Sequence, residues 1–262
     1  AKNSGTLGRI ILGLLINSPY PIKLIGDKSL SKRDFSRVTN PLKMFGVNII
    51  SNKNSLPVEI TGSDFLRPIR YDEELGSAQC KSSVMLAAIK TPGKTIIKAK
   101  KSRNHTELIF KYLKIPIKIV RKRGYDHIEI IGPCNFKGFE YKIPGDISSS
   151  SFFLVLTLLS KKSNLIIKNV NVNNTRIGII KILNSMNAKI SLKNKKLYKG
   201  EEVADIIVKS SNKLKGFNCP ESLNSSAIDE FLIIFLVAAK AKGVSTFKNL
   251  SELNKKESPR LE

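Results

Sequence analysis

The repeat on which this chain is built is clearest in its last copy, where residues 227–260 read AIDEFLIIFLVAAKAKGVSTFKNLSELNKKESPR. An acidic pair precedes an apolar run long enough for a helix, and Asp229 is predicted to cap that helix and to complement its dipole. A strand is predicted over residues 244–250. The stretch closes on the charged residues Lys256, Glu257 and Arg260.

The same order of signals occurs three more times toward the amino end. Polar residues at Ser4, Ser77 and Ser149 each open an apolar run, and the four starts recur at intervals of roughly 75 residues. In the first three copies a turn and a strand follow, then a second amphipathic helix and another strand. The second helices are predicted over residues 33–45, 106–113 and 175–186, and the strands after them over residues 47–50, 117–120 and 189–192. Alternating helices and strands indicate an α/β or α+β fold.

Several helix starts carry residues suited to binding an anion. Free N–H groups and short polar side chains at converging helix starts form an anion site without a glycine-rich phosphate loop. Gly5 allows a ligand to approach the backbone closely. Arg33 lies at the start of the helix predicted over residues 33–45, where a cation opposes the helix dipole, so a bound anion is indicated. Ser77 and Gln79 offer a hydroxyl and an amide to phosphate oxygens.

Residues 143–146 form a predicted turn and the best candidate domain boundary, which gives domains over residues 1–143 and 144–262. The serine run at residues 148–151 is predicted to cap the third helix. Residues 200–205 are predicted to form a surface turn that leads into a strand.

The composition limits the classes of protein. The chain has 262 residues, of which 41% are hydrophobic, and 45 Lys and Arg against 21 Asp and Glu give a net charge of +24. Such a charge first suggests nucleic acid, but it is spread along the chain without a basic block or a recognisable nucleic-acid motif. Much of it is interpreted as solvated surface, and the rest as attraction for small anionic substrates. Three cysteines and two histidines show no metal-ligand spacing, and no apolar run reaches the length of a membrane span, so a cytoplasmic protein is predicted.

Six motifs in order resemble one enzyme family. They read Gly-Asp-x-Ser-Leu-x-Lys-Arg at 26–33, Ser-Ala-Gln-x-Lys at 77–81, Arg-x-His-Thr-Glu at 103–107, Pro-Gly-Asp-x-Ser-Ser at 144–149, Asn-x-Thr-Arg at 173–176 and Lys-Glu-Ser-x-Arg at 256–260. Together, over nearly the whole chain, they resemble the 5-enolpyruvylshikimate-3-phosphate synthases, in the bacterial class with Ser-Ala-Gln. The resemblance implies two similar domains of repeated βαβαββ units, the enolpyruvyl transferase fold, with the active site in the cleft. It also implies that this chain is truncated at both ends.

The family transfers the enolpyruvyl group of phosphoenolpyruvate to the 5-hydroxyl of shikimate 3-phosphate, releases phosphate and needs no metal or other cofactor. The resemblance implies that Ser77, Gln79 and Arg103 bind substrate, with Ser77 and Arg103 on shikimate 3-phosphate. It implies that Arg33 and Arg260 hold the phosphate and carboxylate of phosphoenolpyruvate. A monomer is expected.

The resemblance also assigns the chemistry. Asp229 would accept the hydroxyl proton, Lys256 would contact the substrate hydroxyls, and Lys256 or Glu257 would transfer the proton at the methylene carbon. Gly5 would line the phosphoenolpyruvate pocket, which in this family also binds the inhibitor glyphosate. The Ser-Ala-Gln, Arg-x-His-Thr-Glu and Asn-x-Thr-Arg motifs resemble the class that is often tolerant of glyphosate, whereas tolerant members commonly carry Ala at the place of Gly5. We weight the residue above the class and predict an enzyme that is more sensitive than its motif class suggests.

Some features depart from the family pattern. Asp34 stands where the family usually has Pro, and Pro259 stands where it usually has Asp. The family's N-terminal Lys-Ser…Arg cluster and its C-terminal Arg and Lys ligands are absent from this sequence, so the chain alone is predicted to be inactive. One alternative is the sister enzyme that acts on UDP-N-acetylglucosamine, although its usual reactive cysteine is replaced by Lys28. A second alternative is a basic nucleic-acid-binding scaffold, whose affinity would fall steeply with salt.

Overall fold

A computed structural model describes residues 1–255, and the chain divides into two compact units, Ala1–Gly138 and Phe139–Glu262. The sequence placed the boundary slightly later, at the turn of residues 143–146. Each unit has its own buried hydrophobic cluster. Among the described residues, no helix combines the length and the apolar character needed to cross a membrane.

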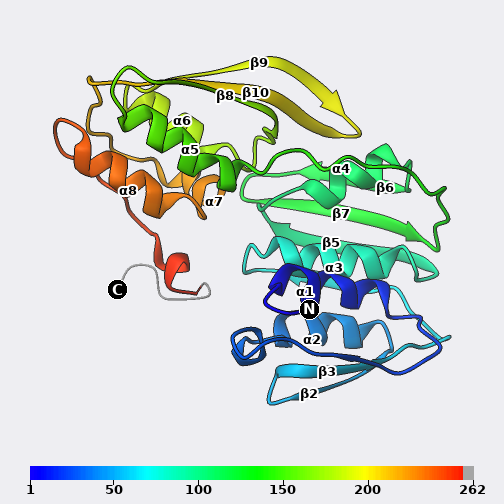
Figure 1. Ribbon diagram of the computed structural model, residues 1–262. Coiled ribbons are helices and arrows are strands. Elements are labelled where there is room, and N and C mark those ends of the chain that lie inside the picture. Colours follow the sequence, from blue (N-terminus) through cyan, green and yellow to red (C-terminus); the bar gives the residue numbers. More distant parts are fainter. Residues whose placement is uncertain (256–262) are drawn as a thin grey trace. The chain divides into compact units, whose positions relative to one another are not determined.

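The first unit contains two sheets with helices between them (Figure 1). One sheet has the order β1-β3-β2 and is antiparallel, and the other has the order β4-β5-β7-β6, in which only β4 and β5 run parallel. The second half of this unit follows the order βαβαββ. Its elements are α1 (Gly5–Leu14), β1 (Ile22–Leu24), η1 (Leu30–Lys32), α2 (Ser36–Met44), β2 (Asn48–Asn52), β3 (Ser55–Thr61), β4 (Arg70–Glu73), α3 (Ala78–Ala88), β5 (Gly93–Lys100), α4 (His105–Tyr112), β6 (Ile117–Arg121) and β7 (Tyr125–Gly132).

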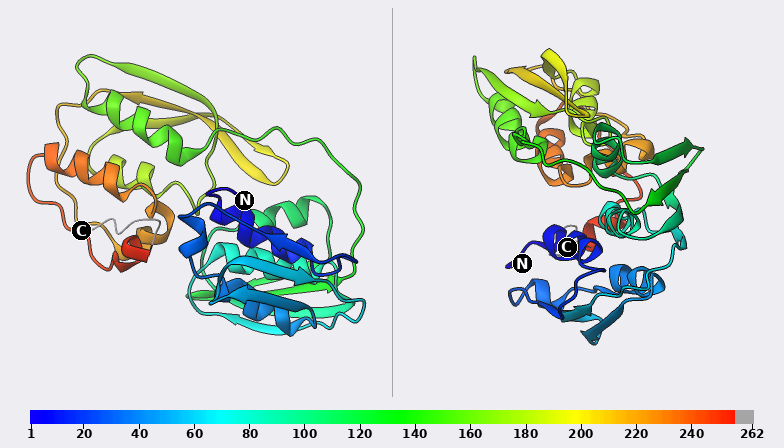
Figure 2. Two further views of the ribbon diagram at one scale, coloured as in Figure 1. Left: turned by 60° about the horizontal axis from the view of Figure 1, so that its bottom comes forward. Right: turned by 90° about the vertical axis from the view of Figure 1, so that its right-hand side faces the viewer.

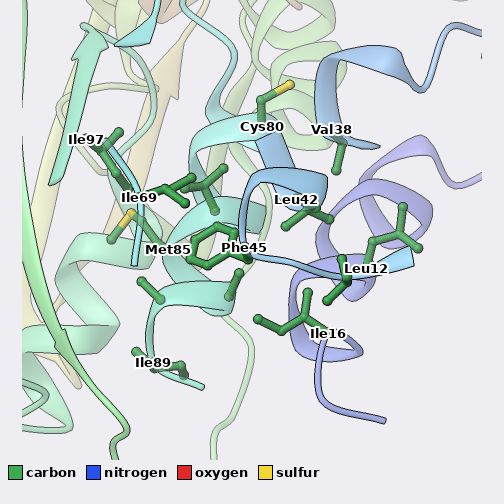
Figure 3. Close-up of a cluster of buried hydrophobic side chains, with 14 of the residues drawn as sticks. Leu12, Ile16, Val38, Leu42, Phe45, Ile69, Cys80, Met85, Ile89 and Ile97 are labelled. Atoms are coloured by element: carbon green, nitrogen blue, oxygen red, sulfur yellow. The ribbon is translucent and has the colours of Figure 1, made fainter. Parts of the chain in front are cut away.

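Helices α1, α2 and α3 form the centre of the first unit, and their apolar faces meet in its core (Figure 3). Val38 and Leu42 of α2 lie four residues apart and are fully buried, as expected for one face of a helix. Leu12 of α1 is equally buried, and Ile16, just beyond the end of α1, lies in the same cluster. Met85 of α3 lies in the same cluster. Because the apolar residues of α1 and α3 are packed in the core, the polar first turns of these two helices are held in fixed positions.

The second unit has one antiparallel sheet with the order β8-β10-β9, and helices pack on one of its faces (Figure 1). Strands β9 and β10, yellow in Figure 2, run side by side as a hairpin. Its elements are α5 (Ile147–Leu159), β8 (Asn164–Asn171), α6 (Gly178–Ser185), β9 (Lys189–Tyr198), β10 (Glu201–Lys209), η2 (Glu221–Leu223), α7 (Asn224–Ala227), α8 (Phe231–Lys240) and η3 (Ser251–Lys255).

Two predictions of secondary structure are wrong. Residues 244–250 form no strand and make only an isolated bridge, between Thr246 and Asn218. A β-like composition marks a segment that could pair, but it does not supply a neighbouring strand. Residues 201–205 belong to β10, because the hairpin turns at Lys199 and Gly200, which both have positive φ. Positive φ at both central residues is the conformation that joins two strands through a two-residue turn.

The cap of α5 also differs from the prediction. The Oδ2 atom of Asp146 accepts a hydrogen bond from the Ser149 amide at 2.8 Å, so Asp146 caps this helix and the serine run forms its first turn. The helix predicted over residues 33–45 begins later, at Ser36, because residues 30–32 first form the 3₁₀ turn η1.

Candidate active site

The start of α1 brings two arginine side chains to a glycine. Ser4 caps the helix by accepting a hydrogen bond from the Leu7 amide at 3.1 Å, and Gly5 is the first helical residue. A Cβ atom built on Gly5 would lie 3.1 Å from Nη1 of Arg33 and 3.3 Å from Nη1 of Arg9. Two guanidinium groups thus approach the positive end of a helix dipole, an arrangement that favours a bound anion.

Arg9 is a candidate site residue that the sequence analysis missed. Its Nη1 donates to Oε1 of Gln79 at 2.8 Å, and its guanidinium lies over the ring of Phe35, 5.3 Å from the ring centre. Burial lowers the pKa of Arg9, and the neighbouring charge of Arg33 acts in the same direction. The signal that could have revealed Arg9 is a lone charged residue directly before the apolar run of the first helix.

Gln79 connects the starts of α1 and α3. Besides accepting from Arg9, its Nε2 donates to Oγ1 of Thr6 at 2.8 Å. Both groups of the amide are therefore used, which fixes its orientation. The predicted residues Gly5, Arg33 and Gln79 thus belong to one cluster that Arg9 holds together.

Ser77 lies at the cap of α3, where its hydroxyl accepts a hydrogen bond from the Cys80 amide at 3.3 Å. The turn before it is fixed by Glu73, a buried residue at the end of β4. Oε1 of Glu73 accepts from the amides of Ser77 at 3.0 Å and Leu75 at 3.1 Å. Ser77 and Gln79 therefore share the first turn of a helix whose start is held from both sides.

Arg103 lies in the loop between β5 and α4, and the structure ties this loop to α3. Nζ of Lys81 donates to the carbonyl oxygen of Arg103 at 2.9 Å, and it lies 2.6 Å from Oε1 of Glu107. Both ion-pair partners are almost completely buried. Ser77, Gln79 and Arg103, all predicted to bind substrate, are thus carried by two segments in direct contact.

In the second unit, Asp229 is not the cap of α8 that the sequence predicted. It lies in the turn between α7 and α8, and the cap residue is Glu230, whose side chain makes no capping hydrogen bond. Helix α7 ends at Ala227 and α8 begins at Phe231, so the polar pair 229–230 lies in the turn that links them. Asp229 is half-buried there.

Glu230, next to Asp229, takes part in a polar network at the start of α5. It is only 2% exposed and accepts a hydrogen bond from the Ser148 hydroxyl. Arg176 donates through Nη2 to Oγ of Ser148 at 2.7 Å and to Oδ1 of Asp146 at 3.0 Å. Arg176 thus joins Asp146 and Ser148, which belong to another motif, and Ser148 bonds to Glu230 in the turn that carries Asp229.

The charge of this network follows from its hydrogen bonds. Burial alone would raise the pKa of Asp146, but the hydrogen bonds from Ser149 and the charge of Arg176 outweigh it, so this pKa lies below its ordinary value of 3.8. Asp146 is therefore ionised at neutral pH, and its stabilising contribution is lost only as the pH falls through its lowered pKa.

Lys256, Glu257 and Arg260 lie outside the described residues. Within residues 1–255, no group of three His, Cys, Asp or Glu side chains is placed to hold a metal ion. The chemistry that the described clusters support is binding of small anions in the first unit, through paired guanidinium groups and helix starts.

Comparison with solved structures first defines the class. The chain matches the enolpyruvyl transferase NikO of Streptomyces tendae with a TM-score of 0.66 at 14% identity, covering 89% of this chain and 53% of that one, which shows a shared fold. It matches an EPSP synthase of Acinetobacter baumannii with a TM-score of 0.85 at 35% identity, covering 99% of this chain and 58% of that one. The fold is that of the enolpyruvyl transferases.

Residues 1–262 match the family described as EPSP synthase (3-phosphoshikimate 1-carboxyvinyltransferase), and the chain belongs to this family. A 3-phosphoshikimate 1-carboxyvinyltransferase of Ruthia magnifica subsp. Calyptogena magnifica is 41% identical over 261 residues, which are 99% of this chain and 59% of that protein. One of Caldicellulosiruptor saccharolyticus is 40% identical, covering 99% and 60%. The chain thus spans about three fifths of these relatives. Their names do not favour the UDP-N-acetylglucosamine alternative.

Proposed function

We propose that the full-length gene product containing this chain transfers the enolpyruvyl group of phosphoenolpyruvate to the 5-hydroxyl of shikimate 3-phosphate. The observation that carries this proposal is the cluster at the start of α1, where the guanidinium groups of Arg9 and Arg33 lie beside Gly5. Two phosphates and a carboxylate need several fixed cations in a site that excludes water. Family membership supplies the identity of the substrates.

In the first unit, Arg33 binds phosphoenolpyruvate next to the backbone of Gly5. Arg9 supports that site by orienting the Gln79 amide, whose donor and acceptor are both engaged. Ser77 and Arg103 bind the phosphate of shikimate 3-phosphate, because a hydroxyl at a helix start and a guanidinium both donate to phosphate oxygens.

In the second unit, Asp229 takes the proton of the 5-hydroxyl as its oxygen bonds to the enolpyruvyl carbon. The C–O bond to phosphate breaks, and the methylene carbon gains and then loses one proton. The hydroxyl proton leaves Asp229 with the released phosphate, so the base is regenerated. Lys256 and Glu257 carry that transfer, and Arg260 binds the carboxylate of phosphoenolpyruvate. A lysine beside a carboxylate would favour the ionised form that a general base needs.

The two units represent the two similar domains of the family, and the partners are small anions. No cofactor, metal or nucleic acid takes part, and the protein acts as a cytoplasmic monomer. The basic surface serves to attract anionic substrates.

The test is phosphate release by the purified full-length gene product. We expect release that depends on both phosphoenolpyruvate and shikimate 3-phosphate, and none when UDP-N-acetylglucosamine replaces shikimate 3-phosphate. Titration with single- and double-stranded nucleic acid at two salt concentrations is the control for the scaffold alternative. Absence of phosphate release together with tight, salt-sensitive binding of nucleic acid would refute the proposal.

Replacement of Gly5 by alanine is expected to weaken phosphoenolpyruvate binding and to weaken glyphosate binding more. The new methyl would lie 3.1 Å from Arg33 and 3.3 Å from Arg9, so both guanidinium groups must shift by a few tenths of an ångström. Displaced cations should raise the KM for phosphoenolpyruvate by about tenfold, since small misplacements of binding groups are costly. The longer inhibitor also meets the methyl itself.

Gly8→Ala is the matched control. A Cβ at Gly8 would meet Phe35 at an ordinary distance of 3.4 Å, and neither Arg9 nor Arg33 is among its three nearest atoms. Inhibition is measured in competition with phosphoenolpyruvate for all three forms. A Gly5→Ala protein with unchanged inhibition would show that another part of the site sets tolerance.

A further inference from the structure

The buried pair Lys81–Glu107 is the most unusual polar contact in the first unit. Their side chains are 1% and 4% exposed, and Nζ of Lys81 lies 2.6 Å from Oε1 of Glu107. By contrast, the ion pairs described between neighbouring strands are exposed to solvent, and their side chains are between 37% and 60% exposed. Removing two charges from water has a high free-energy cost, and apolar residues of similar size are often as stabilising. Stability therefore gives a weak reason for this pair.

The pair does have a directional effect on the loop that carries Arg103. The same ammonium group that pairs with Glu107 donates to the carbonyl oxygen of Arg103 at 2.9 Å. Glu107 comes from the first turn of α4, just after that loop. Lys81, in the first turns of α3, thus bonds both to the loop that carries Arg103 and to the helix that follows this loop.

A second contact holds the same two segments together. The hydroxyls of Ser82 and Thr106 are 2.6 Å apart and share a hydrogen bond. Ser82 directly follows Lys81, and Thr106 directly precedes Glu107. Contacts at Arg103, Thr106 and Glu107 leave the loop little freedom to shift along α3. The start of α3 carries Ser77 and Gln79, so the position of Arg103 relative to these two residues is fixed.

A related contact occurs in the second unit. Arg176, at the loop before α6, bonds to the cap Asp146 of α5, which lies 30 residues earlier. In the first unit Glu107 pairs with Lys81, in the first turns of α3, and not with the cap Ser77. In both units a charged side chain near the start of the second helix thus reaches the first turn of the first helix. In the first unit its partner there, Lys81, also bonds to the predicted substrate ligand Arg103.

We infer that Lys81 and Glu107 are positioning residues, which hold the backbone of Arg103 where its side chain can bind the phosphate of shikimate 3-phosphate. This inference rests on the function proposed above. Neither side chain touches substrate, because both are buried in the unit. Their effect is therefore expected on the affinity for one substrate, with little effect on phosphoenolpyruvate, whose predicted ligand Arg33 lies in another segment.

The main test is the double variant Lys81→Met with Glu107→Gln in the full-length gene product, which removes both charges and leaves no buried ion unpaired. We expect a melting temperature close to that of the unchanged protein and a KM for shikimate 3-phosphate raised by about tenfold. The KM for phosphoenolpyruvate should change less than about twofold, since Arg33 is untouched. Calorimetric titration with shikimate 3-phosphate alone should give the same loss of affinity.

The matched control neutralises the exposed pair Lys98–Asp72 of β5 and β4, with Lys98→Met and Asp72→Asn, and should change neither KM. Ser82→Ala, which deletes only the second contact, gives a milder test should the double variant fail to fold. Its KM for shikimate 3-phosphate should rise by about threefold, with phosphoenolpyruvate unaffected.

Trypsin cleavage after Arg103 under native conditions measures the loop without reference to catalysis. Cleavage should be severalfold faster in the double variant than in the control, with sites outside this loop unchanged. A folded double variant with unchanged affinity for shikimate 3-phosphate overturns the inference. If the double variant does not fold, a Ser82→Ala variant with unchanged affinity overturns it instead. If the unchanged protein neither binds nor converts shikimate 3-phosphate, the proposed function fails, and the cleavage rate alone decides whether the pair holds the loop.

Discussion

Replacement of Asp229 by alanine is expected to lower kcat of the full-length gene product by about a hundredfold or more, the loss typical of a missing general base. Shikimate 3-phosphate should still bind. The turn that carries Asp229 has an independent anchor in Glu230, which is buried and bonded to Ser148. Removal of the half-buried Asp229 carboxylate should therefore remove its chemistry while the turn keeps its position.

Asp229→Asn keeps the size of the side chain and removes its charge, so it should lose as much activity as the alanine variant. Glu221→Ala, at an exposed acid of η2 in the same unit, is the control and should leave kcat unchanged. The measurements are steady-state rates and calorimetric binding of shikimate 3-phosphate. Near-normal turnover by the asparagine variant would exclude Asp229 as the base.

Replacement of Gly13 by alanine should destabilise the first unit by about 3 kcal/mol, at the upper end for an overpacked core. A Cβ on Gly13 would lie 2.0 Å from the carbonyl oxygen of Ser83 and 2.8 Å from its carbonyl carbon. These are backbone atoms of α3, so no side chain can move aside, and α1 and α3 would have to separate. The higher helix propensity of alanine, about 1 kcal/mol over glycine, cannot offset this.

Gly8→Ala on the same helix is again the matched control. Its Cβ would meet Phe35 at 3.4 Å, so it should be neutral or stabilising by up to about 1 kcal/mol. Urea unfolding of the three proteins measures the difference, followed by circular dichroism. If Gly13→Ala and Gly8→Ala unfold at the same urea concentration, the close contact between α1 and α3 does not exist in solution.

The sequence by itself determined the repeat and the starts of α1 and α3. Ser4 and Ser77 cap α1 and α3 as predicted, because a short polar side chain before an apolar run satisfies a free N–H group locally. Periodicity likewise gave the order of helices and strands, and the motifs gave the family, which the comparisons confirm. These are properties of residues near one another in the chain, and they need no knowledge of the fold.

Only the tertiary structure decided which distant residues meet. Arg9 bonds to Gln79, 70 residues later, and Lys81 bonds to Arg103 and Glu107 across a strand and a loop. No local pattern predicts such contacts, since they depend on how α1, α3 and the loop before α4 pack together. For the same reason residues 244–250, with a strand-like pattern but no adjacent strand, remained irregular, whereas residues 201–205 paired with β9 and became a strand. Polarity sets what a segment can do, and the partner that packing supplies decides what it becomes.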